Sequence, residues 1–154
     1  MLAETRQLLR LRKLRVQRAR EACAQAQAAV EAAAHAVQQR QHAIERAQRE
    51  VDMLAHALVH GLAPTLPRWS EIAAARRKRL ADQLEREEYA LIDDEHALEQ
   101  ARERLQQARA DLTRALARED AVRGLAGDAQ RAVLQAREQK LDRESDDQLL
   151  RRAR

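Results

Sequence analysis

The stretch from residue 16 to residue 58 reads VQRAREACAQAQAAVEAAAHAVQQRQHAIERAQREVDMLAHAL, and its apolar residues decide the fold. It belongs to a longer series in which an apolar residue stands at every seventh position: Leu2, Leu9, Val16, Cys23, Val30, Val37, Ile44, Val51 and Leu58. A strict repeat of seven keeps one face of a helix against a partner helix, as in a left-handed coiled coil. The stretch therefore predicts one long helix with a continuous apolar seam.

A second series with the same spacing follows: Leu84, Leu91, Leu98, Leu105 and Leu112. Gly61, Pro64 and Pro67 separate the two series, and these residue types end helices. We predict an all-α fold, an antiparallel two-helix coiled-coil hairpin with a C-terminal helical overhang. The predicted segments are a hairpin at 1–129, with helices at about 2–60 and 70–123 and a turn at 61–69, and a charged extension, helical or frayed, at 130–154.

The turn contains specific signals for the helix ends. Gly61 can adopt the left-handed conformation that caps a helix, and Pro64 blocks its continuation. The second helix is expected to begin with Pro67 in its first turn or with Ser70 as its cap.

The register follows from the sizes of facing residues. If Val16 faces Ala115, then Ala47 faces Leu84, and large meets small in layer after layer, which fills space at a close helix separation. This register puts the middle of the fold-back at residues 65–66, inside the predicted turn. It also leaves the residues after about 130 without a partner helix. Gly124 and Gly127 lie where this pairing ends, and we expect a kink or break of the helix there.

Polar residues interrupt the seam at a few core positions. Arg40 lies between Glu87 and Asp94 in this register, and Arg12 falls opposite Glu119. One hypothesis is that Arg40 contacts both carboxylates and fixes the register. In the alternative, the three side chains reach water from a seam that is never dry.

Composition limits the function. Charged residues make up 35% and aromatic residues 1%, which is typical of long helices rather than of a globular core. No apolar run is long enough to span a bilayer, and no signal peptide pattern precedes the first heptad, so we expect a cytoplasmic protein without membrane insertion. The 29 basic residues are mixed with 25 acidic ones, and stacking aromatics are scarce, so nucleic-acid binding is not expected. The single Cys23 on the seam is interpreted as a small buried hydrophobe.

Residues for catalysis are not grouped in this sequence. The glycines form no phosphate-binding loop, and two helices alone make no pocket for a catalytic set. His56 and His60 have a spacing that can hold a metal, but nothing is placed to complete the site. We expect neither an enzyme nor a bound cofactor or metal.

The N-terminal end carries a surface that the seam does not use. Leu8, Leu11 and Leu14 fall outside the core positions. Basic residues surround them: Arg6, Arg10, Arg12, Lys13, Arg15, Arg18 and Arg20. Apolar side chains ringed by arginine favour docking to an acidic partner, although single exposed leucines are also common on ordinary surfaces. Near the turn, Trp69 and the basic run from Arg76 to Arg79 indicate a second contact, or only a solvated surface.

Residues 8–19, LLRLRKLRVQRA, open a two-helix coil and resemble the YscO/HrpO (FliJ-like) family of type III secretion export-apparatus stalk proteins. The resemblance implies a non-catalytic cytoplasmic stalk, peripheral to the inner-membrane export apparatus, that docks into and regulates the hexameric export ATPase and contacts the export gate. Some members of that family also bind secretion chaperones. Carried onto this chain, the ring-facing residues are Arg6, Arg10, Leu11, Lys13, Leu14, Arg15 and Arg18. The gate-side residues are Leu66, Trp69, Arg76 and Arg77.

Two other functions remain open from the sequence. The coil could be an adaptor that binds secretion chaperones, or a purely structural coil that dimerises through its seams. The large-to-small layers within one chain favour a monomer.

Overall fold

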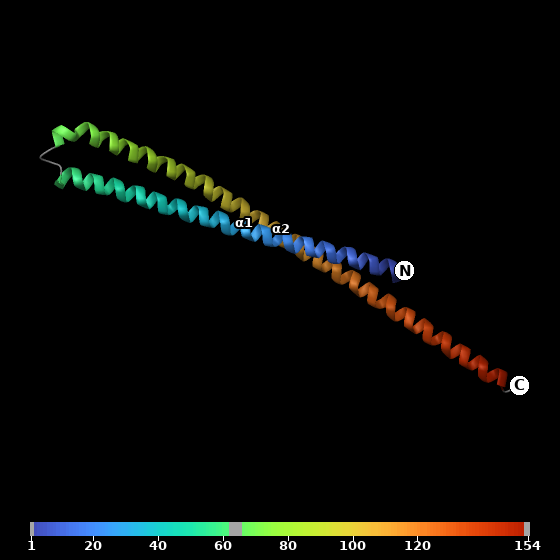
Figure 1. The fold of residues 1–154 in the computed structure, drawn as a ribbon. Coiled ribbons are helices and arrows are strands. Elements are labelled where there is room, and N and C mark those ends of the chain that lie inside the picture. The colour runs from blue at the N-terminus through green and yellow to red at the C-terminus, as the bar shows by residue number, and fades with distance from the viewer. Residues whose placement is uncertain (1, 62–65, 153–154) are drawn as a thin grey trace. The chain divides into compact units, whose positions relative to one another are not determined.

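The structure, a computed structural model, describes residues 2–61 and 66–152, with side chains described at 3–60 and 69–145. Its elements are α1 (Leu2–His56), the π-helical turn η1 (Ala57–Gly61) and α2 (Leu66–Arg152) (Figure 1). No strand occurs in these ranges. The two helices pack against each other, which confirms the predicted all-α two-helix hairpin.

The lengths of α1 and α2 follow from their composition. Between residues 2 and 60 there is no glycine or proline, and the same holds between residues 68 and 123. Alanine, leucine, arginine, glutamine and glutamate dominate both stretches, and all of them have high helix propensity. Nothing in either stretch therefore interrupts the backbone hydrogen bonds of the helix.

The chain divides into two compact units, each built from a part of α1 and a part of α2. Unit 1 contains Met1–Ala24 and Gln107–Arg154, and unit 2 contains Gln25–Gln106.

Unit 2 has a narrow apolar core between its helix segments. The buried hydrophobic residues are Val37, Ile44 and Ala47 of α1 and Leu80, Ala101 and Leu105 of α2. All six lie at positions that the repeat of seven assigns to the seam. The predicted core face of unit 2 is therefore confirmed.

The core of unit 1 is smaller and contains a charged residue. Val16 of α1 and Val122 of α2 are buried, and Glu119 of α2 is buried with them at 7% exposure. Arg12 and Ala115 are half-buried in the same unit. The seam positions are again those that the sequence predicts.

The overhang begins where the register places it. Ala129 is half-buried, and every side chain from 130 to 145 is exposed. However, α2 continues without interruption through Gly124 and Gly127 to Arg152, so a break at these glycines and a second helix that ends at 123 are both wrong. An added Cβ at either glycine would meet no atom within 4 Å, so each is simply an open position on a helix that tolerates glycine at a modest cost.

The helix ends near the turn differ in detail from the prediction. Since α2 begins at Leu66, the turn is shorter than 61–69, and Pro67 lies in the first turn of the helix, where proline loses no hydrogen bond. No described glycine has a positive φ, so Gly61 does not provide a left-handed cap. The π-helical turn η1 follows α1 and ends the first helical segment of the hairpin instead. The predicted block at Pro64 and the predicted midpoint at Thr65 lie outside the described residues.

Candidate partner-binding surfaces

Three leucines of α1 in unit 1 are exposed because the seam faces elsewhere. Leu8 is 39% exposed, Leu11 51% and Leu14 57%, whereas Leu9 and Val16 on the seam are half-buried and buried. A repeat of seven can bury only one stripe of a helix, so leucines at other positions must face solvent. We call Leu8, Leu11 and Leu14 the leucine surface.

Arg12 is half-buried, but the other basic residues predicted around the leucine surface are exposed as well: Arg6, Arg10, Lys13, Arg15, Arg18 and Arg20. None of them forms an ion pair with another described residue. Some exposed arginines elsewhere on the described chain do pair along their own helix, as Arg49 does with Glu45 and Arg102 with Glu99. The cations at this end of α1 therefore keep their charge available to a partner.

Lys13 and Arg20 differ from the other basic residues of this group. They line a shallow hollow of about 420 Å³ together with Val16, Gln17, Leu116, Glu119, Asp120 and Arg123. Carboxylates and cations are mixed along this hollow, so the positive surface ends at Lys13 and Arg20 on the side that faces α2.

Arg12 and Glu119 share the core of unit 1, as the register predicts, but Glu119 has another partner. Its Oε1 accepts a hydrogen bond from Nη2 of Arg123, four residues later on α2, at 2.5 Å. The buried Nε of Arg12 has no hydrogen-bond partner within the described part of the chain. An unpaired buried donor lowers stability, so this layer is a weak point of the unit 1 seam.

The polar group predicted in the middle of the hairpin is present in unit 2. Arg40 Nη1 donates to Glu87 Oε2 at 2.6 Å, and Arg40 Nε donates to Asp94 Oδ2 at 3.0 Å. The hydrogen bond to Glu87, and after it that to Asp94, raises the pKa of the Arg40 guanidinium. All three side chains are between 23% and 34% exposed, so the group is neither dry nor fully solvated. The predicted contact is confirmed, whereas its effect on register stays a prediction.

The two partners of Arg40 also test the register itself. Glu87 and Asp94 lie four residues before and three residues after Leu91, which the register places opposite Arg40. A side chain that bonds to both must lie between them, at the level of Leu91. The ion pairs therefore agree with a register derived only from residue sizes.

The structure describes the side chains of some, but not all, of the residues predicted at the hairpin end. Trp69 is 47% exposed on α2, and Arg76 and Arg77 are exposed further along it. Leu66 is the first residue of α2, and its side chain lies outside the described residues.

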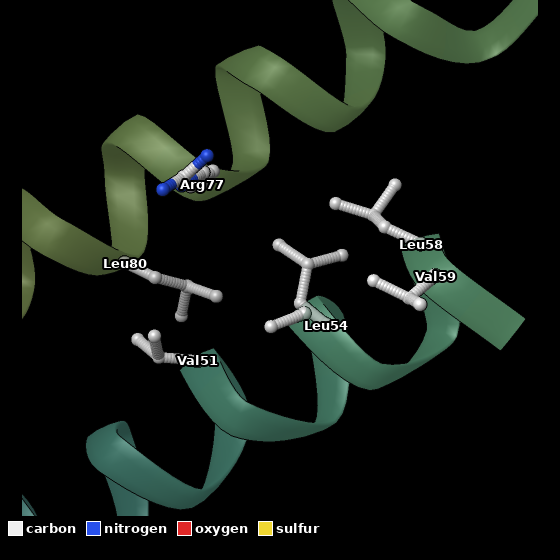
Figure 2. A pocket seen from close by; sticks show the side chains of 7 residues that line it. Val51, Leu54, Leu58, Val59, Arg77 and Leu80 are labelled. Carbon is white, nitrogen blue, oxygen red and sulfur yellow. The ribbon is translucent and has the colours of Figure 1, made fainter. Parts of the chain in front are cut away.

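Sequence reasoning missed an apolar hollow in this part of unit 2. It has a volume of about 270 Å³ and is lined by Val51, Leu54, Ala55, Leu58, Val59, Arg77 and Leu80 (Figure 2). In Figure 2, Leu80 points from α2 toward Val51, while Leu54 and Leu58 extend into the space between the two helices. We call this hollow the tip groove.

A sequence signal for the tip groove did exist. The leucines of α2 recur every seven residues back to Leu84, and the next position in that series is Arg77. The register places Arg77 opposite Leu54 and places Ala73 opposite Leu58. Because neither residue of α2 fills the layer with apolar bulk, the leucines of α1 remain partly uncovered.

The histidines and the cysteine are the remaining candidates for a metal site or a reactive site. Among the described residues no group of three or more histidines, cysteines or carboxylates could hold a metal. The rings of His56 and His60 lie 4.5 Å apart between centroids, and their planes are tilted by 45°. Cys23 is a free, half-buried thiol on the seam of unit 1.

Comparisons of the chain with protein-family models, with curated proteins and with solved structures found no match. Within the ranges that the structure describes, no helix is both long and apolar enough to cross a bilayer. The function is therefore inferred from the chain's own side chains.

Proposed function

We propose that the chain is a non-catalytic stalk component of a type III secretion export apparatus, which docks into the hexameric export ATPase and regulates it. The observation that carries this proposal is the leucine surface of unit 1, exposed on α1 and surrounded by cations that form no ion pair within the described part of the chain. The resemblance of residues 8–19 to the YscO/HrpO family supports the choice of partner.

The chemistry of the leucine surface favours a protein partner with acidic and apolar groups. Burying Leu11 and Leu14 in a partner would remove their exposed apolar area from water, which stabilises a complex by roughly 25 cal/mol per Å². The arginines around them accelerate encounter with a negatively charged surface and set its orientation. Apolar anchors give affinity, and the basic rim gives specificity.

In this proposal the ATPase performs the hydrolysis, and the present chain changes only its assembly or activity. The second contact in this proposed role is with the export gate, near Leu66, Trp69, Arg76 and Arg77. Both contacts are made in the cytoplasm, peripheral to the inner-membrane apparatus, and secretion chaperones are further candidate partners.

The experiment adds the purified chain to the export ATPase encoded beside it and measures hexamer formation and ATP turnover. The wild-type chain is expected to increase both. The variant Arg10→Glu with Lys13→Glu is expected to abolish the increase while circular dichroism stays helical, because both side chains are exposed.

A matched control is available in the same unit. Arg137→Glu with Lys140→Glu reverses the same two residue types at the same spacing, on exposed positions of the overhang. This control is expected to stimulate the ATPase like the wild type. Equal loss in both variants would reduce the effect to net charge, and an ATPase that does not respond to the wild-type chain would refute the proposal.

A further inference from the structure

The tip groove of unit 2 lies beside cations that form no ion pair with another described residue. Arg77 lines it, and Arg76, Lys78 and Arg79 are its neighbours in sequence. All four side chains are exposed, and none of them forms an ion pair with another described residue. In contrast, Arg40 in the same unit is bonded to two carboxylates.

Two further hollows are lined by residues around this basic segment, and their linings are also apolar and basic. One is lined by Leu58, Ala73, Ala74, Ala81, Ser70, Arg77 and Lys78, and the other by Ile72, Ala75, Leu80, Arg76, Arg79 and Gln83. No carboxylate belongs to the described lining of these two hollows or of the tip groove. The described part of this surface therefore combines apolar hollows with basic side chains and without carboxylates.

Exposed apolar side chains belong to this surface. Val59 of the tip groove is 66% exposed and Ile72 of the third hollow 61%, and Trp69, which lines none of the three hollows, is 47% exposed. Isolated exposed apolar residues need no explanation, but here they lie on the two helix segments that form the tip groove.

We propose that the tip groove binds an acidic amphipathic helix of a partner protein. Apolar side chains on one face of that helix would enter between Leu54, Leu58 and Leu80, and its carboxylates would pair with Arg77 and Lys78. This is the helix-in-groove mode, in which anchors spaced i, i+3, i+4 and i+7 fill an apolar groove between helices. A concave groove between two helices suits such a ligand better than a bilayer, which is bound by the convex apolar face of a helix.

This inference specifies the kind of partner that would bind at the hairpin end. It rests on the proposed function only for the assumption that a partner binds there. The two can fail separately, because the leucine surface lies in unit 1 and the tip groove in unit 2. ATPase stimulation reports on the first, and binding of a peptide reports on the second.

The test uses the full chain and a fluorescent helical peptide of about 18 residues, with leucines spaced i, i+3, i+4 and i+7 and with glutamates on its other faces. Fluorescence anisotropy is expected to show saturable binding. A peptide of the same design with lysines in place of the glutamates is expected to bind at least about tenfold more weakly, because like charges then meet.

Two variants and two matched controls locate the site. Arg77→Glu with Lys78→Glu is expected to weaken binding about tenfold, whereas Arg46→Glu with Arg104→Glu, an equal charge change at exposed positions of unit 2, is not. Ala55→Phe fills the groove and is expected to reduce binding by a similar factor. The control for this volume change is Ala34→Phe, which lies at an exposed position of α1 outside the groove.

Several results would overturn the proposal. They are equal binding of the lysine peptide, unchanged binding by both groove variants, or binding to anionic phosphatidylserine vesicles that depends on the same residues while the acidic peptide does not bind. Concentration-dependent self-association that is lost in the groove variants would also overturn it, since the occupant would then be a second copy of the chain.

Discussion

Ala47 is the most sensitive test of how the two helices are spaced. It is 2% exposed, the lowest value among the buried core residues, and the register places it opposite Leu84. Replacing it with leucine adds three carbon atoms. If space were available, their burial would stabilise the fold by about 0.8 kcal/mol for each added group, or roughly 2.4 kcal/mol in total.

The packing predicts the opposite sign. With almost no exposed area at Ala47 and a leucine expected in the facing position, the added atoms can enter only if the helices separate or a side chain leaves its preferred rotamer. Overpacking of this kind costs about 1–3 kcal/mol. We therefore expect Ala47→Leu to lower the free energy of unfolding by about 1–2 kcal/mol, although leucine is the more hydrophobic residue.

The assay is urea unfolding followed by circular dichroism, with linear extrapolation of the free energy. The control is Ala28→Leu, at an exposed position of α1, which is expected to change stability by less than about 0.5 kcal/mol. If Ala47→Leu instead stabilised the chain by about 2 kcal/mol, the alternation of large and small residues would not set the helix separation, and the register argument would lose its basis.

Other predictions concern the glycines of α2 and the register. Gly124→Ala with Gly127→Ala is expected to raise the free energy of unfolding by about 1–2 kcal/mol, because both positions are helical and open; no gain in urea unfolding would contradict a continuous helix there. With the native cysteine replaced by alanine, cysteines at Ala26 and Leu105 are expected to crosslink within one molecule on oxidation, and a crosslinked dimer on a non-reducing gel would contradict the hairpin. Adding Arg40→Leu to that chain is expected to lower the intramolecular yield, because the register loses its polar contact, and an unchanged yield would show that the apolar layers fix the register alone.

The seam was predictable because a repeat of seven depends only on the sequence of one chain. Every described seam residue from Leu9 to Leu58 is buried or half-buried, and the start of the exposed overhang after Ala129 follows from the same register. The ion pairs of Arg40 were also predictable from the sequence, because opposite charges at facing core positions have few other partners with which to pair.

The helix boundaries were less predictable, because they depend on a balance of small effects. Gly124 and Gly127 were expected to break α2, yet each costs only about 1 kcal/mol in a helix, and their neighbours compensate for it. The tip groove was missed for another reason. A sequence register says which residues face each other, but it does not say that a layer such as Leu54 with Arg77 stays open.

Arg40 has a mechanical consequence for a coil that carries axial load. It holds Glu87 and Asp94 simultaneously, and these carboxylates stand one heptad apart on α2. If α2 slid by one heptad in either direction, leucine layers would meet equivalent layers, but Arg40 would keep one carboxylate and face Leu80 or Ala101 in place of the other. Sliding of one helix along the other is therefore opposed at this layer, because any shift by one heptad breaks one of the two ion pairs.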